Sequence, residues 1–256
     1  MALSILGALA IGVCLGLLGS GGSILTVPVL VYLVHHPEKQ AIAESLAIVG
    51  GIAVAGAGVN IAKRQVDWTS VLFFAPPSML GAYLGAVMSA PVPGHILLSV
   101  FAMIVLLAAY MMLRGPDLHL PYPRAPRAAW KILLDGFFVG CLIGFVGVGG
   151  GFMIVPALVM LGGLPMRRAV GSALCIVTLS SAISFFKHWD ELHGTNMPVD
   201  WKTIRLFLPI GIMGSVVGNF IGERADHGRL RRGFGWFLAL MGLVILTLQF
   251  WPRASQ

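Results

Sequence analysis

Six apolar runs, each long enough to cross a lipid bilayer as a helix, constrain this chain more than any other feature of its sequence. A helix needs about 20 apolar residues to span the hydrocarbon core. Only 11% of the residues are charged, against about 25% in soluble domains. The sequence therefore predicts an all-α, polytopic membrane protein. The predicted spans are residues 40–60, 69–89, 95–113, 169–187, 203–221 and 233–251.

Two further apolar segments, residues 24–34 and 151–162, are too short to span. At 1.5 Å per residue each would be roughly 17 Å long, about half of the hydrocarbon core. Each follows a glycine-rich run, GLLGSGGS in the first case and GFVGVGGG in the second. We therefore expect a broken or re-entrant helix pair at each place. The N-terminus carries no positive region before its apolar stretch, so we interpret it as an uncleaved first helix.

The second part of the chain repeats the first. With a shift of 128 residues, positions 12–31 and 140–159 share nine identities in twenty. After a five-residue insertion, the triplet VDW at 66–68 aligns with VDW at 199–201. We interpret this pattern as a duplication. The expected parts are an N-terminal membrane repeat (1–114), a linker (115–134) and a C-terminal membrane repeat (135–256).

The distribution of Lys and Arg predicts the orientation, because cytoplasmic loops are enriched in these residues. With the N-terminus outside, 12 of the 17 basic residues fall in cytoplasmic loops. Five elements in each half would invert the second repeat relative to the first. We therefore expect two inverted repeats in the inner (plasma) membrane, both termini on the periplasmic side and the linker 115–134 in the cytoplasm.

The glycine runs predict a binding site, because irregular backbone at membrane depth is tolerated only where protein covers it or where it lines a watery cavity. Each run precedes a short helix whose first amides are unpaired and electropositive, which suits an anion. We expect the two runs to meet near the midplane. The substrate-binding candidates are Ser20, Gly21, Gly22, Ser23, Ser45, Gly149, Gly150, Gly151 and Ser172.

Glycines spaced by four residues have a simpler interpretation, which is close packing of two helices. We prefer it for Gly12 with Gly16 and for Gly140 with Gly144. Ser45 and Ser172 also have an alternative role, which is hydrogen bonding back to their own helix carbonyls.

Three stretches, GLLGSGGSILTVPVL, GFVGVGGGFMIVPALVMLGG and RRAVGSAL, resemble the TauE/SafE sulfite exporter family of membrane permeases. The resemblance covers essentially the whole chain. It implies an exporter of small sulfur-containing anions, such as sulfite, sulfoacetate or related organosulfonates, with no enzymatic activity. In one respect the chain departs from the family pattern: AIAESL at 41–46 places Glu44 where the family usually has a small hydroxyl residue, which raises the question of a proton.

Ionisable and amide groups inside a membrane are functional candidates by default. Glu44, Asn60, His188 and Arg205 are our candidates for proton coupling or gating. The alternatives are a Glu44 that reaches solvent near a helix N-terminus, a His188 that closes a helix C-terminus, and an Arg205 that anchors at the interface, which we favour. We expect Asn219 to bond to a neighbouring helix.

The remaining features limit the function classes. The net charge of +7 is divided among short loops, so we assign it to membrane topology and predict no nucleic-acid partner. Histidines and cysteines lack ligand spacing, so no metal or other cofactor is predicted. We favour a secondary transporter with alternating access over a passive anion channel. An intramembrane enzyme is less favoured, since no nucleophile–base cluster is visible. A homodimer is left open.

Overall fold

The computed structural model describes residues 2–18, 21–114, 129–147, 151–194, 199–224 and 227–250. All regular structure in these ranges is helical, as predicted. The first half holds α1 (Ala2–Leu18), α2 (Gly21–Pro28), α3 (Glu38–Ala62), α4 (Trp68–Ser89) and α5 (Gly94–Arg114). The second half holds α6 (Ala129–Val146), α7 (Gly151–Pro156), α8 (Met166–Gly194), α9 (Trp201–Arg224) and α10 (His227–Phe250).

Five of the six predicted runs form helices that are long and apolar enough to span a membrane, namely α3, α4, α5, α8 and α9. The sixth run falls in α10, whose described apolar part is Arg232–Thr247. The predicted linker is too long at one end, because α6 already begins at Ala129 and not at residue 135. Residues 115–128 of that linker lie outside the described ranges.

The two short segments form short helices that change their hydrogen-bonding pattern at a proline. The α-helical part of α2 ends at Pro28 and that of α7 at Pro156. Two π-helical turns follow, η1 (Val29–Leu33) and η2 (Ala157–Leu161). Proline has no amide hydrogen to donate to the carbonyl four positions earlier. A change from the α-helical to the wider π-helical turn at a proline therefore loses no hydrogen bond of the proline itself.

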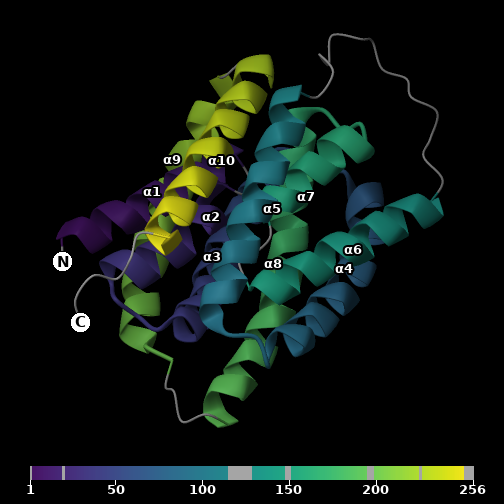
Figure 1. Cartoon of the computed structure of the whole chain (residues 1–256). Helices are drawn as coiled ribbons and strands as arrows, with labels where there is room; N and C mark the ends of the chain where they lie inside the picture. The colour runs from purple at the N-terminus through teal and green to yellow at the C-terminus, as the bar shows by residue number, and fades with distance from the viewer. Residues whose placement is uncertain are drawn as a thin grey trace.

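Outside the short helices, α1 packs against α9 and α4 against α6, so that each pair joins the two halves of the chain. Figure 1 shows the α1–α9 pair at the left and the α4–α6 pair at the right, with α5 and α10 between them in this view. A Cβ on Gly12 would lie 2.1 Å from the oxygen of Gly211, and one on Gly16 would lie 1.9 Å from that of Ser215.

The α4–α6 pair repeats this contact at equivalent positions. A Cβ on Gly140 would lie 2.2 Å from the oxygen of Ser78, and one on Gly144 would lie 1.9 Å from that of Ala82. Side chains of any size would separate these backbones. Close helix packing, the preferred interpretation of the four spaced glycines, is confirmed.

At the centre of the molecule, α3 packs against α8. About two thirds of the apolar window of each is buried (67%), against 39–44% in α4, α5 and α9. The exposed surface of these outer helices carries large apolar side chains such as Leu72, Met88, Met103 and Met213. The α3–α8 pair is therefore enclosed by the other helices, and buried polar groups along it require an explanation.

Candidate functional site

The two helix breaks lie near opposite ends of the α3–α8 pair. At the second break, the Ser45 hydroxyl donates to the oxygen of Gly147 at 3.2 Å. Before the first break, Gly16 lies against Ser215, whose Oγ is 3.3 Å from the position of a Cβ on Gly56. Ser45 and Gly56 are 11 residues apart on α3, roughly 16 Å of helix.

The described residues beside the two breaks therefore lie at different levels of α3, and a single cradle formed by the two glycine runs stays a prediction. The physical reason for the different levels is the length of the helices that precede the breaks. α1 has 17 residues and α6 has 18, roughly 26 Å each, which already crosses most of a hydrocarbon core. The short helices α2 and α7 then turn back and pack against each other.

One end of the α3–α8 pair is built around Glu44, and we call it the Glu44 end. The carboxylate is fully buried, with 0% of its surface exposed. Its Oε2 lies 2.6 Å from Nδ1 of His36. Its Oε1 accepts from the side-chain amide of Gln40 and from the backbone amide of Asp200, both at 2.8 Å. The alternative in which Glu44 reaches solvent is thus wrong.

Asp200 extends this cluster from the other half of the chain. Its Oδ2 lies 3.9 Å from Nε2 of His36, and it accepts from the hydroxyl of Thr203 and the amide of Lys202. Burial raises the pKa of Asp200, but these hydrogen bonds and the charge of His36 outweigh it, so the pKa is lowered from 3.8. The charged form of Asp200 is therefore favoured in the folded protein.

The opposite end carries the same backbone contact with different side chains, and we call it the Ser172 end. Here the hydroxyl of Ser172 accepts from the backbone amide of Asp67 at 2.8 Å. Ser172 is equivalent to Glu44 under the shift of 128, and Asp67 is equivalent to Asp200 in the repeated VDW triplet. Asp67 also caps α4, since its carboxylate accepts from the amide of Ser70.

The turn before α3 also has its counterpart before α8. His35 (φ 62°) and Gly163 (φ 70°) occupy equivalent positions in a left-handed conformation, which glycine adopts at no steric cost. The next residue is His36 in the first half and Leu164, a buried apolar side chain, in the second. The Ser172 end thus has no counterpart of the His36 imidazole.

The structure brings two sequence candidates, Ser45 and His188, together at the second break. His188 Nε2 lies 3.4 Å from the oxygen of Gly144, near the Gly147 that contacts Ser45. Ser45 also bonds back to Ile42 O at 2.8 Å, as the alternative proposed.

Two candidates bond to their own helices. Asn60 is buried and donates to Gly56 O at 2.8 Å. Arg205 is exposed and donates to Trp201 O at 3.3 Å, and its anchoring at the interface stays a prediction.

The glycine runs themselves are described in part. Gly22 packs against α1, where a Cβ would lie 2.2 Å from Ile11 O. Gly21 and Gly151 begin α2 and α7, and Ser23 is buried. Ser20, Gly149 and Gly150 lie outside the described ranges, so their predicted role remains a prediction.

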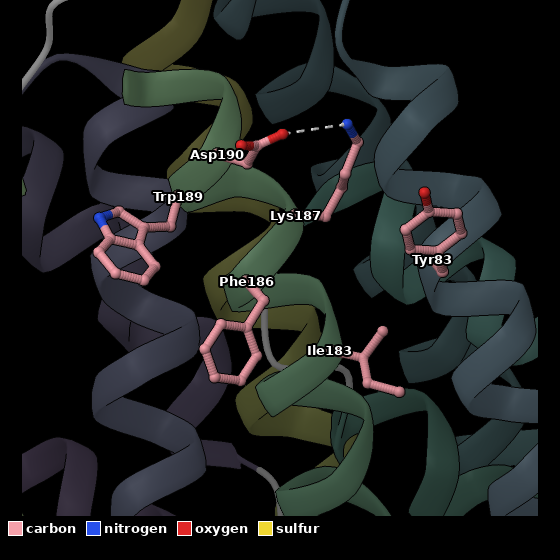
Figure 2. A pocket seen from close by; sticks show the side chains of 6 residues that line it. All are labelled: Tyr83, Ile183, Phe186, Lys187, Trp189 and Asp190. Atoms are coloured by element: carbon pink, nitrogen blue, oxygen red, sulfur yellow. Dashed lines mark ion pairs between the residues drawn. The ribbon is translucent and has the colours of Figure 1, made fainter. Parts of the chain in front are cut away.

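A hollow of about 600 Å³ lies between α4 and α8. Figure 2 shows it flanked by Tyr83 and Phe186, with the ion pair of Lys187 and Asp190 above them. Phe186 is 61% exposed and the side chain of Asp190 is 82% exposed. This hollow faces the surroundings of the protein and contains none of the predicted substrate-binding residues.

Within the described ranges, no group of three or more His, Cys, Asp or Glu residues is placed to hold a metal ion. The sequence analysis missed His36 and the two aspartates, Asp67 and Asp200, that the structure places at the two ends. A histidine eight positions before a glutamate gives no periodic signal. Its partnership with Glu44 follows from the left-handed turn at His35.

Long apolar spans and paired broken helices define the class as a polytopic membrane protein of the transporter type, and comparison with known proteins agrees. Residues 4–245 match the family described as "Sulfite exporter TauE/SafE". The chain belongs to this family, which consists of membrane transporters and not of enzymes.

Relatives cover most of the chain. It is 32% identical over 248 residues to a "Probable membrane transporter protein" of Xylella fastidiosa (strain 9a5c), covering 92% of this chain and 91% of the relative. It is 26% identical to "Probable membrane transporter protein YunE" of Bacillus subtilis (strain 168), covering 87% and 88%. No solved structure matches the chain.

Proposed function

We propose that this protein is a secondary transporter that exports small sulfur-containing anions, such as sulfite or organosulfonates, by alternating access. The family's description names sulfite, and GSGGSI and GVGGGF lack the Lys-Ser/Thr of a nucleotide-binding loop. Energy would then come from gradients. For a doubly charged anion, the membrane potential alone favours export by about 2.3 kcal/mol per charge per 100 mV.

The observation that carries this proposal is the pair of equivalent contacts between the halves. At the Glu44 end the acceptor belongs to the first half and the Asp200 amide to the second. At the Ser172 end the roles are exchanged, with the Asp67 amide in the first half. Two similar contacts at opposite ends suit a protein in which each end opens while the other stays closed.

Charge supports one orientation of the two ends. Lys63, Arg64, Arg167 and Arg168 flank the Ser172 end of the central helices. Cytoplasmic ends are enriched in basic residues, and a positive surface concentrates anions. In the proposed topology the Ser172 end therefore faces the cytoplasm and receives the anion, while the Glu44 end faces the periplasm. The two halves are then inverted repeats.

Glu44 is proposed to bind a proton during the cycle. When the Asp200 amide withdraws, the buried carboxylate loses one of its hydrogen bonds, and a buried unpaired charge is costly. His36 is the adjacent group that can supply a proton, since Nδ1 already contacts Oε2. The other charged groups nearby are Asp200, Lys39, whose Nζ donates to Ala90 O, and Lys202. Opening of this end and proton uptake are then coupled.

Counterflow in proteoliposomes tests the proposed function. Vesicles loaded with unlabelled sulfite should accumulate labelled sulfite transiently, because a carrier exchanges one molecule for another. A parallel assay with sulfoacetate defines the substrate range. A passive channel would equilibrate label without accumulation, and that result would reject the carrier. Absence of movement of either anion would reject the substrate class.

A further inference from the structure

Two polar side-chain atoms of α9 are buried without a hydrogen-bond partner among the described residues. Within the described part of the chain, neither Oγ of Ser215 nor Nδ2 of Asn219 has a donor or acceptor in reach. Their exposed fractions are 1% and 6%. An unsatisfied buried polar group destabilises the folded state, and most buried polar groups in proteins are paired. We infer that Ser215, Asn219 and the start of α2 form a subsite for one small oxyanion.

The first element of this subsite is the direction in which α2 runs. Gly22 lies against Leu15 and Val29 against Gly7, so α2 runs back along α1. The amides at the start of a helix have no intrahelical acceptor and point away from the helix body. The amides of Gly21 and Gly22 therefore point toward the end of α1, which stops at Leu18.

The second element is the position of Ser215 and Asn219 relative to that end. Gly16 lies against Ser215, and Gly218 lies against Leu17, so α9 runs parallel to α1. Asn219 follows Ser215 by one helical turn on the same face of α9 and reaches the level at which α1 ends.

The surrounding helices close this region. Ser215 Oγ approaches Gly56 of α3. The contacts α1–α2, α2–α3, α3–α9 and α1–α9 form a closed ring of four helices. Adjacent residues of α1 contact the start of α2 and Ser215, since Leu15 lies against Gly22 and Gly16 lies against Ser215, so these two parts lie at the same level of α1.

The donor set points to the chemistry of the ligand. A hydroxyl, a side-chain amide and backbone amides can all donate hydrogen bonds, and the helix start adds a positive partial charge. No full positive charge is needed to hold an anion at such a place. A small anion with several oxygens, such as sulfite or a sulfonate, would satisfy groups that are otherwise unpaired.

The second break lacks this donor pair. The positions equivalent to Ser215 and Asn219 in α4 are Ala82 and Ala86, and Ala82 makes the contact with Gly144 that Ser215 makes with Gly16. The subsite is therefore specific to the first break, at the Ser172 end. This inference takes its ligand class from the proposed function. It adds a location for the anion, the first break, and two residues that bind it, Ser215 and Asn219.

The test is anion binding by the purified full-length protein in lipid nanodiscs. Calorimetry with sulfite and with sulfoacetate compares wild type with Ser215→Ala, Asn219→Ala and Asn219→Leu. Ser89→Ala is the matched control, because this buried hydroxyl already bonds to Ala86 O. Loss of a hydrogen bond to a charged ligand should raise the Kd about tenfold or more for both Asn219 variants. Ser89→Ala should leave the Kd unchanged.

Thermal melting without ligand separates a binding role from a structural one. Removing an unsatisfied polar group leaves no partner unpaired, so Ser215→Ala and Asn219→Leu should keep the wild-type Tm or raise it by a few degrees. A clear fall in Tm for both would mean that these groups bond within the protein, and would overturn the inference. A Kd within twofold of wild type for both Asn219 variants would also overturn it.

The two proposals fail in different ways. If wild type binds sulfite and the Asn219 variants bind it equally well, the subsite is wrong and the transport function stands. If wild type binds neither sulfur anion, nitrate and phosphate are tested in the same way. An Asn219-dependent Kd for either would reject the substrate class and support the subsite. Binding of no oxyanion at all would overturn both.

Discussion

The Glu44 end and the Ser172 end share one backbone arrangement and differ in the chemistry placed on it. At each end, a fully buried side chain of a central helix accepts a hydrogen bond from the backbone amide of an aspartate in the other half, at 2.8 Å in both cases. The Glu44 carboxylate also contacts His36, whereas the equivalent of His36 at the other end is Leu164. The repeated backbone thus provides two similar contacts, and only one of them can respond to protons.

The largest effects are expected where the two halves are most alike, in the glycine contacts. Gly16→Ala and Gly144→Ala each place a Cβ 1.9 Å from a backbone oxygen. Since a backbone cannot move aside cheaply, each should lower the free energy of unfolding by about 3 kcal/mol. Thermal melting of the purified variants measures this effect.

Gly58→Ala is the control for that experiment, because a Cβ there meets no atom within 4 Å. It should be neutral or stabilising by up to about 1 kcal/mol. If Gly16→Ala lowered the free energy of unfolding and Gly144→Ala did not, the α1–α9 and α4–α6 pairs would not be equivalent. The comparison of the two halves would then be wrong.

A smaller, unequal effect is expected at the two ends. Glu44→Ala removes the acceptor of Gln40 and of the Asp200 amide and leaves His36 without its carboxylate, so it should cost about 2 kcal/mol. Ser172→Ala leaves only the Asp67 amide unpaired and should cost about 1 kcal/mol. Melting curves at pH 7 compare the two. Equal losses would indicate that the carboxylate adds nothing to the shared contact.

The pH dependence of transport should distinguish the ends without a large change in stability. Glu44→Gln keeps the shape of the side chain but cannot bind or release a proton, so counterflow of sulfoacetate, whose own charge is constant near neutral pH, should lose most of its dependence on pH. Asp190→Asn, which changes an exposed carboxylate, is the control. If the pH profile of Glu44→Gln equalled that of wild type, the proposal that Glu44 binds a proton during transport would be wrong.

The smallest effect concerns Asp200, whose pKa is lowered from 3.8. A lowered pKa means that ionised Asp200 stabilises the fold above pH 3.8 and that this contribution is lost as the pH falls through the lower folded value. Asp200→Asn should therefore melt slightly below wild type at pH 5, and the margin should shrink at pH 3. A margin at pH 3 as large as that at pH 5 would contradict this account of Asp200.

Apolar length and glycine spacing were sufficient to predict much of the fold. The long spans, the two short helices and the close packing at Gly12 and Gly140 follow from local patterns. The level of the breaks was also readable in principle, because residues 2–18 are almost long enough to cross a bilayer and place the first break near one face.

Other features depend on contacts between distant residues. The amide of Asp200 reaches Glu44 across 156 positions of sequence, and no periodicity encodes such a pair. Among the described residues, Nδ2 of Asn219 has no hydrogen-bond partner, whereas the sequence favoured a bond to a neighbouring helix, and this difference depends on the surroundings of the side chain. Contacts between residues of the two halves could therefore be identified only in the structure.

Alternating opening of the two ends can be tested by closing one of them covalently. In a background with Cys14, Cys141 and Cys175 replaced by alanine, the pair Asp67→Cys and Ser172→Cys can be oxidised across the contact of the Ser172 end. If the ends open in turn, counterflow of labelled sulfite should stop on oxidation and recover on reduction. If the protein with an intact disulfide exchanged sulfite as fast as the protein with reduced cysteines, that result would contradict the account.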